Sequence, residues 1–156
     1  MVRRINVNRV EPESDESDPA GYRAAAAHAG VELGSDELSL NVFEIPAGES
    51  LCPYHYEYVE EWLLVLDGTP TLRVPEGDEQ LESGDLVRFP AGPEGAHKLT
   101  NGSENSARVI MFSSSREPSV AVYPDSDKVG VWTPNPDENW MLRRSDGNVG
   151  YYEGEA

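Results

Sequence analysis

The feature that most constrains the fold is a succession of short apolar segments, each closed by a turn signal. Residues 38–45 alternate between apolar and polar side chains and end at Pro-Ala-Gly, while residues 61–66 end at Asp-Gly, a typical hairpin turn. Further strand candidates follow at residues 71–74, 80–82, 85–89, 97–100, 107–112 and 120–123. Short strands separated by turns at this density predict an all-β chain folded as an antiparallel sandwich or barrel.

The two ends of the chain differ from this strand-rich middle. The chain has 156 residues, enough for one domain with a hydrophobic core. Residues 11–19 are acidic and flanked by proline, which favours a flexible segment, and the alanine-rich residues 22–29 predict one short helix. We therefore expect an N-terminal segment over residues 1–30, a barrel over residues 31–125, and a C-terminal extension over residues 126–156 that packs on the barrel.

The charge balance limits the partners of the chain. Aspartate and glutamate total 29 against 12 lysine and arginine residues, a formal net charge of -17. Such a field repels nucleic acid and anionic lipid, so we expect neither as a partner. No apolar run approaches the roughly 20 residues that span a bilayer. The N-terminus lacks the apolar stretch of a signal peptide, and we expect a cytoplasmic protein.

Two of the strand candidates are apolar on both faces. Residues 62–66 (WLLVL) and 109–112 (VIMF) lack alternation, so burying them requires cover outside the barrel. The N-terminal segment, the C-terminal tail or a second subunit could supply this cover. We expect a homodimer.

A group of metal-ligand residue types precedes one of these strands. In the stretch LCPYHYEYVEEWLLVLDG (51–68), alternation along a continuous strand would place His55, Glu57 and Glu61 on one face. Glu61 leads directly into the apolar run, and a buried carboxylate is costly unless it is paired or binds a metal. The alternative is a set of polar residues that merely precede a buried strand. A second candidate region contains His97, after a loop rich in proline and glycine.

Together the two regions resemble the motifs of the cupin superfamily. The first region reads Gly48, six residues, His55, one residue, Glu57, three residues, Glu61, six residues, Gly68. The second reads Gly84, five residues, Pro90, one residue, Gly92, four residues, His97, three residues, Asn101. The resemblance covers roughly residues 30–135 and extends to a group of bacterial and archaeal single-domain cupins. It implies a double-stranded β-helix, also called a jelly-roll barrel.

The resemblance also implies a metal site. In the superfamily three histidines and one glutamate hold the metal, which here gives His55, Glu61 and His97, with Glu57 replacing the remaining histidine. Two imidazoles and two carboxylates suit one divalent iron, manganese or zinc ion per chain better than copper. Without Glu57, the other three form the two-histidine, one-carboxylate set of non-haem iron sites. Either histidine alone could instead be a hydrogen-bonded residue of the barrel mouth or of a turn.

A metal with open positions can polarise a carbonyl or bind oxygen. The leading hypothesis is therefore a metal-dependent enzyme acting on a small molecule, either a sugar or sugar-phosphate isomerase or a non-haem metal dioxygenase. Glu57 is the candidate catalytic residue, as general base. The competing hypothesis is a non-catalytic module that binds a small molecule or a metal, and a third is a structural, dimerising protein with a vestigial pocket.

Three further residues near these motifs have simpler interpretations. Cys52 lies three positions before His55, so on a continuous strand it faces away from the ligands as a buried, inert thiol. Arg73 and Arg88 lie in strand candidates and are expected to pair with surface carboxylates. The alternative for both arginines is to line the pocket and bind an anionic substrate.

The acidic composition leads to a prediction about salt. Only two of the basic residues are lysines, Lys98 and Lys128, and a dense carboxylate surface with so few lysines is typical of halophilic proteins. Salt screens the repulsion among exposed carboxylates to within a few ångströms at molar concentration. We predict that the melting temperature, followed by circular dichroism, rises from low to molar KCl. A melting temperature that stays flat over this range would contradict adaptation to high salt.

Overall fold

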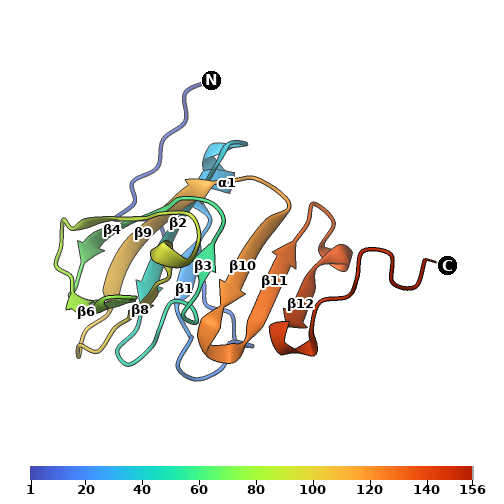
Figure 1. Ribbon diagram of the computed structural model, residues 1–156. Coiled ribbons are helices and arrows are strands. Elements are labelled where there is room, and N and C mark those ends of the chain that lie inside the picture. The colour runs from blue at the N-terminus through green and yellow to red at the C-terminus, as the bar shows by residue number, and fades with distance from the viewer. Residues whose placement is uncertain (156) are drawn as a thin grey trace.

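The computed structural model describes residues 1–155 and is built mainly of strands (Figure 1). In chain order the strands are β1 (Ala25–Ala27), β2 (Leu38–Ile45), β3 (Tyr56–Glu57), β4 (Glu61–Asp67), β5 (Thr71–Val74), β6 (Gly77–Gln80), β7 (Leu86–Phe89), β8 (Lys98–Thr100), β9 (Ala107–Ser114), β10 (Ser119–Tyr123), β11 (Lys128–Trp132) and β12 (Trp140–Arg143). Helical segments are α1 (Ala29–Leu33) and the 3-10 turns Pro93–Gly95, Pro124–Ser126, Pro136–Glu138 and Arg144–Asp146.

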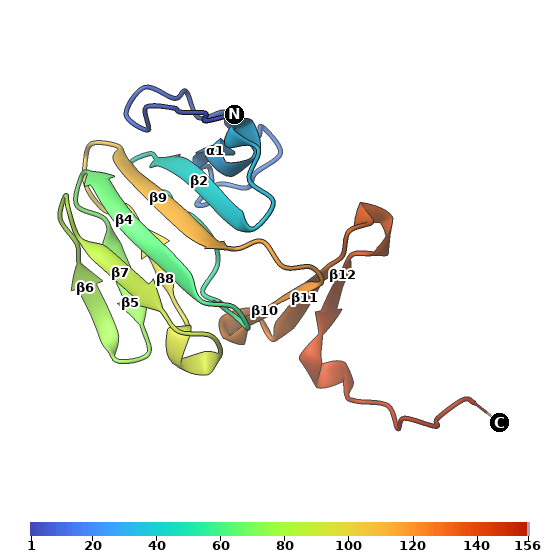
Figure 2. The same cartoon turned by 90° about the horizontal axis from the view of Figure 1, so that it is seen from above.

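The strands form three antiparallel sheets, with the orders β1-β2-β9-β4-β7, β6-β5-β8 and β12-β11-β10-β3. The five-stranded and three-stranded sheets face each other, and the third sheet lies to one side of them (Figure 2). The main core fills the space between the two facing sheets and consists of Ile45, Leu63, Val65, Leu72, Leu81, Phe89, Leu99 and Val109. This arrangement confirms the predicted all-β jelly-roll barrel.

The outer face of the five-stranded sheet is apolar as well. β4 sends Leu63 and Val65 into the main core, whereas Leu64 and Leu66 point to the opposite face. The N-terminal segment covers that face, because Ile5, Val7, Val10 and Ala29 pack there with Val42 and Ile110 in a second cluster. The predicted need for outside cover is therefore met within the chain, at least in part. The homodimer remains a prediction.

Polar contacts hold the N-terminal segment on the sheet. Arg108 of β9 donates hydrogen bonds to the backbone carbonyls of Val7 and Val10. The same guanidinium pairs with the Glu44 carboxylate of β2 at 3.2 Å. Arg108 therefore joins two neighbouring strands to the segment that covers them.

The predicted helix over residues 22–29 is wrong in its position. Ala25–Ala27 form the edge strand β1, which pairs with residues 42–44 of β2. Glu13 bonds to the other side of this strand, through two backbone hydrogen bonds of 2.9 Å with Ala26. Alanine prefers the helix by less than about 1 kcal/mol per residue, and pairing along a sheet edge outweighs this preference. The helix begins only at Ala29 and ends at Leu33.

The other strand predictions are confirmed within one or two residues, except for the one at residues 80–82. That strand, β6, begins earlier, because Pro75 and Glu76 form a two-residue turn that pairs Val74 directly with Gly77. Leu81 has already left the ladder and is buried in the main core. The continuous strand considered for residues 55–61 is interrupted, because β3 covers only residues 56–57 and β4 begins at Glu61. The C-terminal strands β11 and β12 were not predicted as strands.

The C-terminal strands widen the third sheet away from the barrel (Figure 2). β11 pairs with β10 along its whole length, and β12 pairs with β11. Three large apolar residues of β12 are more than half exposed: Trp140, Met141 and Leu142. Within residues 1–155, no helix is long and apolar enough to cross a membrane.

The packing of the N-terminal segment leads to a prediction about stability. Val7 contacts the apolar cluster on the outer face of the sheet, whereas Val2 is fully exposed on the same segment. Replacing Val7 by aspartate places a charge against apolar side chains, which should lower the free energy of unfolding by about 1–3 kcal/mol. Val2→Asp should change it by less than about 0.5 kcal/mol. Chemical denaturation measures both.

The same two variants also test where the cover of the sheet comes from. If Val7→Asp is as stable as Val2→Asp, the N-terminal segment does not protect the outer face. Light scattering on the unaltered chain then becomes the direct measurement, since a second subunit would have to supply the cover.

Candidate metal centre

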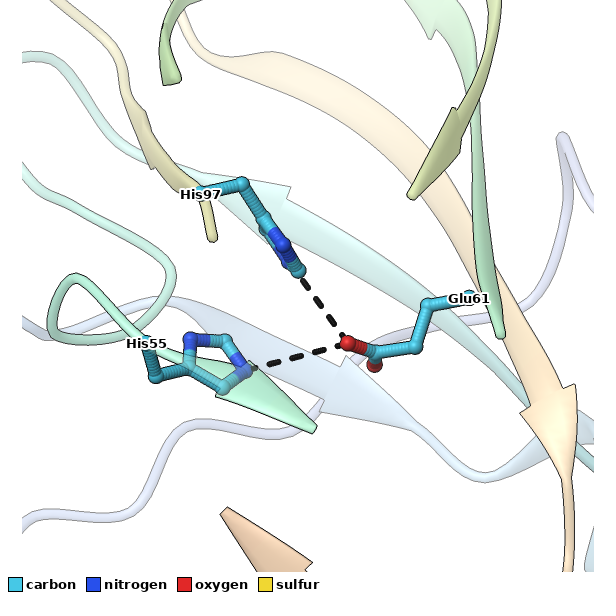
Figure 3. A group of neighbouring side chains, drawn as sticks. All are labelled: His55, Glu61 and His97. Carbon is cyan, nitrogen blue, oxygen red and sulfur yellow. Dashed lines mark ion pairs between the residues drawn. The ribbon is translucent and has the colours of Figure 1, made fainter. Parts of the chain in front are cut away.

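The two predicted histidine ligands lie side by side because their backbones pair. The amide of His55 donates to the carbonyl of His97 over 3.1 Å, and the reverse hydrogen bond measures 2.8 Å. Glu61 is the first residue of β4 and approaches from the five-stranded sheet. Figure 3 shows the three side chains pointing toward one another from three separate segments.

The ligand atoms of this trio, His55, Glu61 and His97, all lie within 4.8 Å of one another. Oε2 of Glu61 is 4.0 Å from Nε2 of His55 and 3.9 Å from Nε2 of His97 (dashed lines in Figure 3). Both distances are too long for a hydrogen bond. Two atoms bound to one ion at about 2.1 Å lie at most about 4.2 Å apart, so Glu61 and either histidine can share an ion.

The second ring nitrogen of each histidine fixes its tautomer. Nδ1 of His97 is 2.8 Å from the carbonyl oxygen of Gly95, and Nδ1 of His55 is 3.0 Å from that of Pro53. A carbonyl oxygen only accepts, so Nδ1 is the protonated nitrogen in both rings. Each neutral imidazole therefore directs an unprotonated Nε2 toward Glu61, as metal-binding histidines do.

One further observation supports a metal ion at these residues. Nε2 of His97 is buried and has no hydrogen-bond partner within the described chain. The ring is held in place by Phe89, which stacks on it with centroids 3.7 Å apart. An unsatisfied buried polar atom costs about 1–3 kcal/mol. A cation bound between this nitrogen and Glu61 would remove that cost.

Burial also perturbs the protonation of the trio. Burial, with the Glu57 charge as second cause, raises the pKa of Glu61 from its ordinary 4.5 to about 8. Burial, with the neighbouring His55, lowers the pKa of His97 from 6.5 to about 4. Burial likewise lowers the pKa of His55. Near neutral pH the close pairs are therefore neutral rather than ionic, and a divalent cation would favour ionised Glu61.

Glu57 lies beside the trio but outside it. It belongs to β3, and its side chain lines the same pocket as His55 and Glu61. Burial raises the pKa of Glu57. Glu57 is therefore not part of the group of candidate ligands, but it is a nearby carboxylate with a raised pKa. Its predicted roles as ligand and as base stay predictions.

His55 and Glu61 of the trio, together with Glu57, line a pocket of about 370 Å³ between the barrel and the start of β10. The inward faces of β2 and β9 form much of its wall. Polar side chains predominate on this wall: Ser39, Asn41, Ser113, Ser114, Ser115, Arg116, Glu117 and Ser119. A volume near 300–1,000 Å³ is typical of sites for small molecules.

The expectation that Cys52 faces away from the ligands is wrong. Residues 51–54 form a bend instead of a continuous strand, and this brings Sγ of Cys52 to 3.5 Å from Nδ1 of His55. The thiol thus contacts the ring nitrogen that points away from Glu61. Burial raises the pKa of Cys52 to about 12, so the thiol stays protonated and inert, as predicted.

Both predicted surface arginines form ion pairs outside the pocket. Arg73 pairs with Asp125 through two hydrogen bonds of 2.5 and 3.1 Å. Arg88 pairs with Glu60 at 2.6 Å. These contacts confirm the surface interpretation over the anion-binding alternative.

Two motif residues outside the trio have structural roles. Gly68 has φ of 86°, and a Cβ there would lie 2.8 Å from Cα of Ala107, so only glycine fits this turn. Asn101 is fully buried, and its Nδ2 donates to the carbonyls of Ile45 and Asn105 at 2.8 Å each. These residues support the loops around the site.

Sequence reasoning missed part of the site. Tyr123 of β10 stacks against His55, with ring centroids 5.8 Å apart and planes 25° apart. Burial, aided by nearby Cys52 and the glutamates, raises the pKa of Tyr123 to about 12. The segment of residues 113–119 was also missed. No local pattern marks these residues, because pairings between distant strands bring them to the site: β10 with β3 for Tyr123, and β9 with β4 for Ser113.

The raised pKa of Glu61 predicts how the metal-free protein responds to pH. Between pH 6.5 and 8 folded Glu61 holds a proton that the unfolded chain releases, so stability falls as the pH rises. The lowered pKa values of His97 and His55 act in the opposite direction, mainly below pH 6.5. Across this window we expect a loss of about 1–2 kcal/mol, or roughly 2–8 °C in melting temperature. Thermal unfolding of chelator-treated protein measures it.

A glutamine variant isolates the responsible group. Glu61→Gln should remove most of this pH dependence of stability. A smaller dependence of the same sign should remain, because the pKa of Glu57 is also raised. Glu79→Gln, at an exposed position of β6, should keep the slope of the unaltered chain. An undiminished slope in Glu61→Gln would show that Glu61 is not the titrating group.

Known proteins share the sequence motifs and the fold of this chain. Residues 41–113 match the family model of the cupin domain. A solved structure described as a candidate sugar phosphate isomerase, from Acidithiobacillus ferrooxidans, superposes with a TM-score of 0.80 at 22% identity, covering 92% of this chain and 91% of that chain. No curated protein sequence matches significantly.

Two further solved structures share the fold. A sugar phosphate isomerase of the cupin superfamily from Silicibacter pomeroyi has a TM-score of 0.80 at 18% identity, covering 96% of this chain and 98% of that chain. The polyketide cyclase RemF from Streptomyces resistomycificus has a TM-score of 0.64 at 22% identity, covering 88% and 92%. Residues 41–113 are therefore a cupin domain, which confirms the resemblance of this chain to the cupin superfamily.

Proposed function

We propose that this chain is a metal-dependent enzyme that isomerises a small, hydroxyl-rich molecule of the sugar or sugar-phosphate class. The observation that carries the proposal is the composition of the pocket. Two side chains of the trio, His55 and Glu61, and a separate carboxylate, Glu57, line the same polar cavity, and the ligand atom of buried His97 lies within 4.8 Å of those of His55 and Glu61. Serine and asparagine side chains on its wall can donate and accept hydrogen bonds, which suits a substrate with many hydroxyl groups.

His55, Glu61 and His97 would hold the ion. A bound divalent cation supplies Lewis acidity, which polarises a carbonyl oxygen and acidifies the neighbouring C–H bond. Three protein ligands leave coordination positions open, in contrast to a structural site with four protein ligands.

Glu57 is the group that would move the proton. Aldose–ketose isomerisation requires a base that removes a proton from one carbon and returns it to the next. A carboxylate whose pKa is raised by burial is better matched to neutral pH than an exposed one. Tyr123, which stacks on His55, would hold the imidazole plane without transferring a proton, because its raised pKa keeps the hydroxyl protonated.

The comparisons support this choice of reaction. Two similar structures are described as sugar phosphate isomerases, one of them as a candidate, and each overlaps more than nine-tenths of this chain. At 18–22% identity this likeness establishes the fold alone. The reaction therefore rests on the pocket.

The donor set favours a second candidate function. Two histidines and one carboxylate are the ligands that non-haem iron oxygenases use. If the resident metal is iron, dioxygenation of the same small molecule becomes the stronger proposal; zinc or manganese favours isomerisation. A non-catalytic module is the remaining alternative, in which the ligand binds but is not converted.

Metal content and turnover test the proposal together. Dialysed protein should retain about one equivalent of a divalent metal by mass spectrometry, and His97→Ala should lose it. His28→Ala, at an exposed histidine of the N-terminal segment, is the matched control and should retain it. Deuterium exchange into a panel of sugars and sugar phosphates, followed by NMR, reports proton transfer at carbon.

The Glu57→Gln variant separates binding from chemistry. It should keep the metal but lower turnover about 10²- to 10⁴-fold, because the base is lost while the trio is intact. Protein without bound metal would exclude the metal site. Full turnover in metal-loaded Glu57→Gln would exclude Glu57 as the base.

A further inference from the structure

One cation lines the candidate pocket, and the proposed function does not use it. Arg116 lies in the turn between β9 and β10, and among residues 1–155 it is the one lysine or arginine on the pocket wall. Unlike Arg73, Arg88 and Arg108, it makes no ion pair or side-chain hydrogen bond within the described residues. Arg116 is therefore a cation on the wall of this pocket that pairs with no carboxylate of the described residues.

Hydroxyl groups without partners line the same pocket as this arginine. Ser113, Ser115 and Ser119 line the same pocket, and their hydroxyls make no hydrogen bond inside the part of the chain that the structure describes. Each hydroxyl can donate one hydrogen bond, and the arginine offers a planar set of five donors. Donors at this density match the oxygens of a phosphoryl group, which arginine binds in a bidentate manner.

The sheet register places these donors next to the trio. Ser113 of β9 is paired with Glu61 of β4 on one side and with Ser39 of β2 on the other, so the three residues share a row across the sheet. Arg116 follows three residues later, a distance of at most roughly 10 Å between Cα atoms. A small molecule can therefore reach the metal ligands with one end and Arg116 with the other.

The charges of the pocket permit an anion at this end. Glu57 and Glu61 lie at the metal end, where a divalent ion would neutralise both. Glu117 also lines the pocket, but it is exposed, so solvent screens its charge. Arg116 then remains as the local charge that favours an anion.

We infer that Arg116, with the hydroxyls of Ser113, Ser115 and Ser119, forms a phosphate-binding subsite at the mouth of the pocket. The substrate is then a phosphate monoester whose carbonyl or hydroxyl end points toward the trio. This inference rests on the proposed function and selects the phosphorylated members of its substrate class.

Calorimetric titration with inorganic phosphate at constant ionic strength tests the subsite. We expect saturable binding to the unaltered chain and at least a tenfold weaker affinity in Arg116→Gln. Arg116→Lys should lose less, because it keeps the charge but not the fork of donors. Arg143→Gln is the matched control, since Arg143 is exposed and lies on β12 outside the pocket, and it should bind like the unaltered chain. Arg116 is itself exposed, so its variants should fold.

The His97→Ala variant separates this inference from the proposed function. It should still bind phosphate, because the subsite does not include the trio. Phosphate binding that is absent from the unaltered chain, or unchanged in Arg116→Gln, would overturn the subsite. Binding lost in His97→Ala but kept in Arg116→Gln would place phosphate at the metal and overturn it as well. A chain that holds no metal but binds phosphate through Arg116 would overturn the proposed enzyme and leave the subsite standing.

Discussion

The register between β4 and β9 is the constraint on which both the core and the site depend. Leu63 lies opposite Met111 and Glu61 lies opposite Ser113, so Glu61 points to the same side of the sheet as the buried core residues. A slip of one residue would turn Leu63 and Glu61 outward together. Because burying the core opposes such a slip, the apolar residues of β4 also hold the carboxylate at the histidines.

The candidate site buries ionisable side chains, which costs free energy because these groups are better solvated by water. Glu61 and His97 are both pushed toward their neutral forms, and Nε2 of His97 has no partner within the described chain. The protein tolerates this because hydrogen bonds to backbone carbonyls and stacking on Phe89 hold the imidazole of His97 rigidly. Such preorganised and unsatisfied groups are characteristic of a ligand site rather than of a structural core.

The outer apolar face of the five-stranded sheet has to be covered from outside the barrel. β4 and β9 are apolar on both sides, which a barrel with a solvated exterior cannot accommodate. The N-terminal segment supplies part of the cover, and Arg108 ties its carbonyls to β9. The N-terminal segment therefore packs against the two strands that carry Glu61 and Ser113.

The sequence by itself predicted most strands of the barrel, the barrel class and, through the resemblance of its motifs, the candidate ligands His55, Glu57, Glu61 and His97, of which the structure groups all but Glu57. Alternation, turn residues and motif spacing are local signals, and strand formation follows them closely. The alanine-rich segment was misassigned because a weak helix preference yields to sheet pairing that lies about 17 residues away in the chain. Propensity alone cannot report such a pairing.

Only the tertiary structure decided what surrounds the trio. Cys52 meets His55 because the chain bends before β3, and Tyr123 and Arg116 arrive with β9 and β10, more than 50 residues further along the chain. Their positions depend on how the third sheet packs beside the barrel. The candidate ligands are thus marked by local sequence motifs, whereas the pocket beside them is produced by contacts between distant segments.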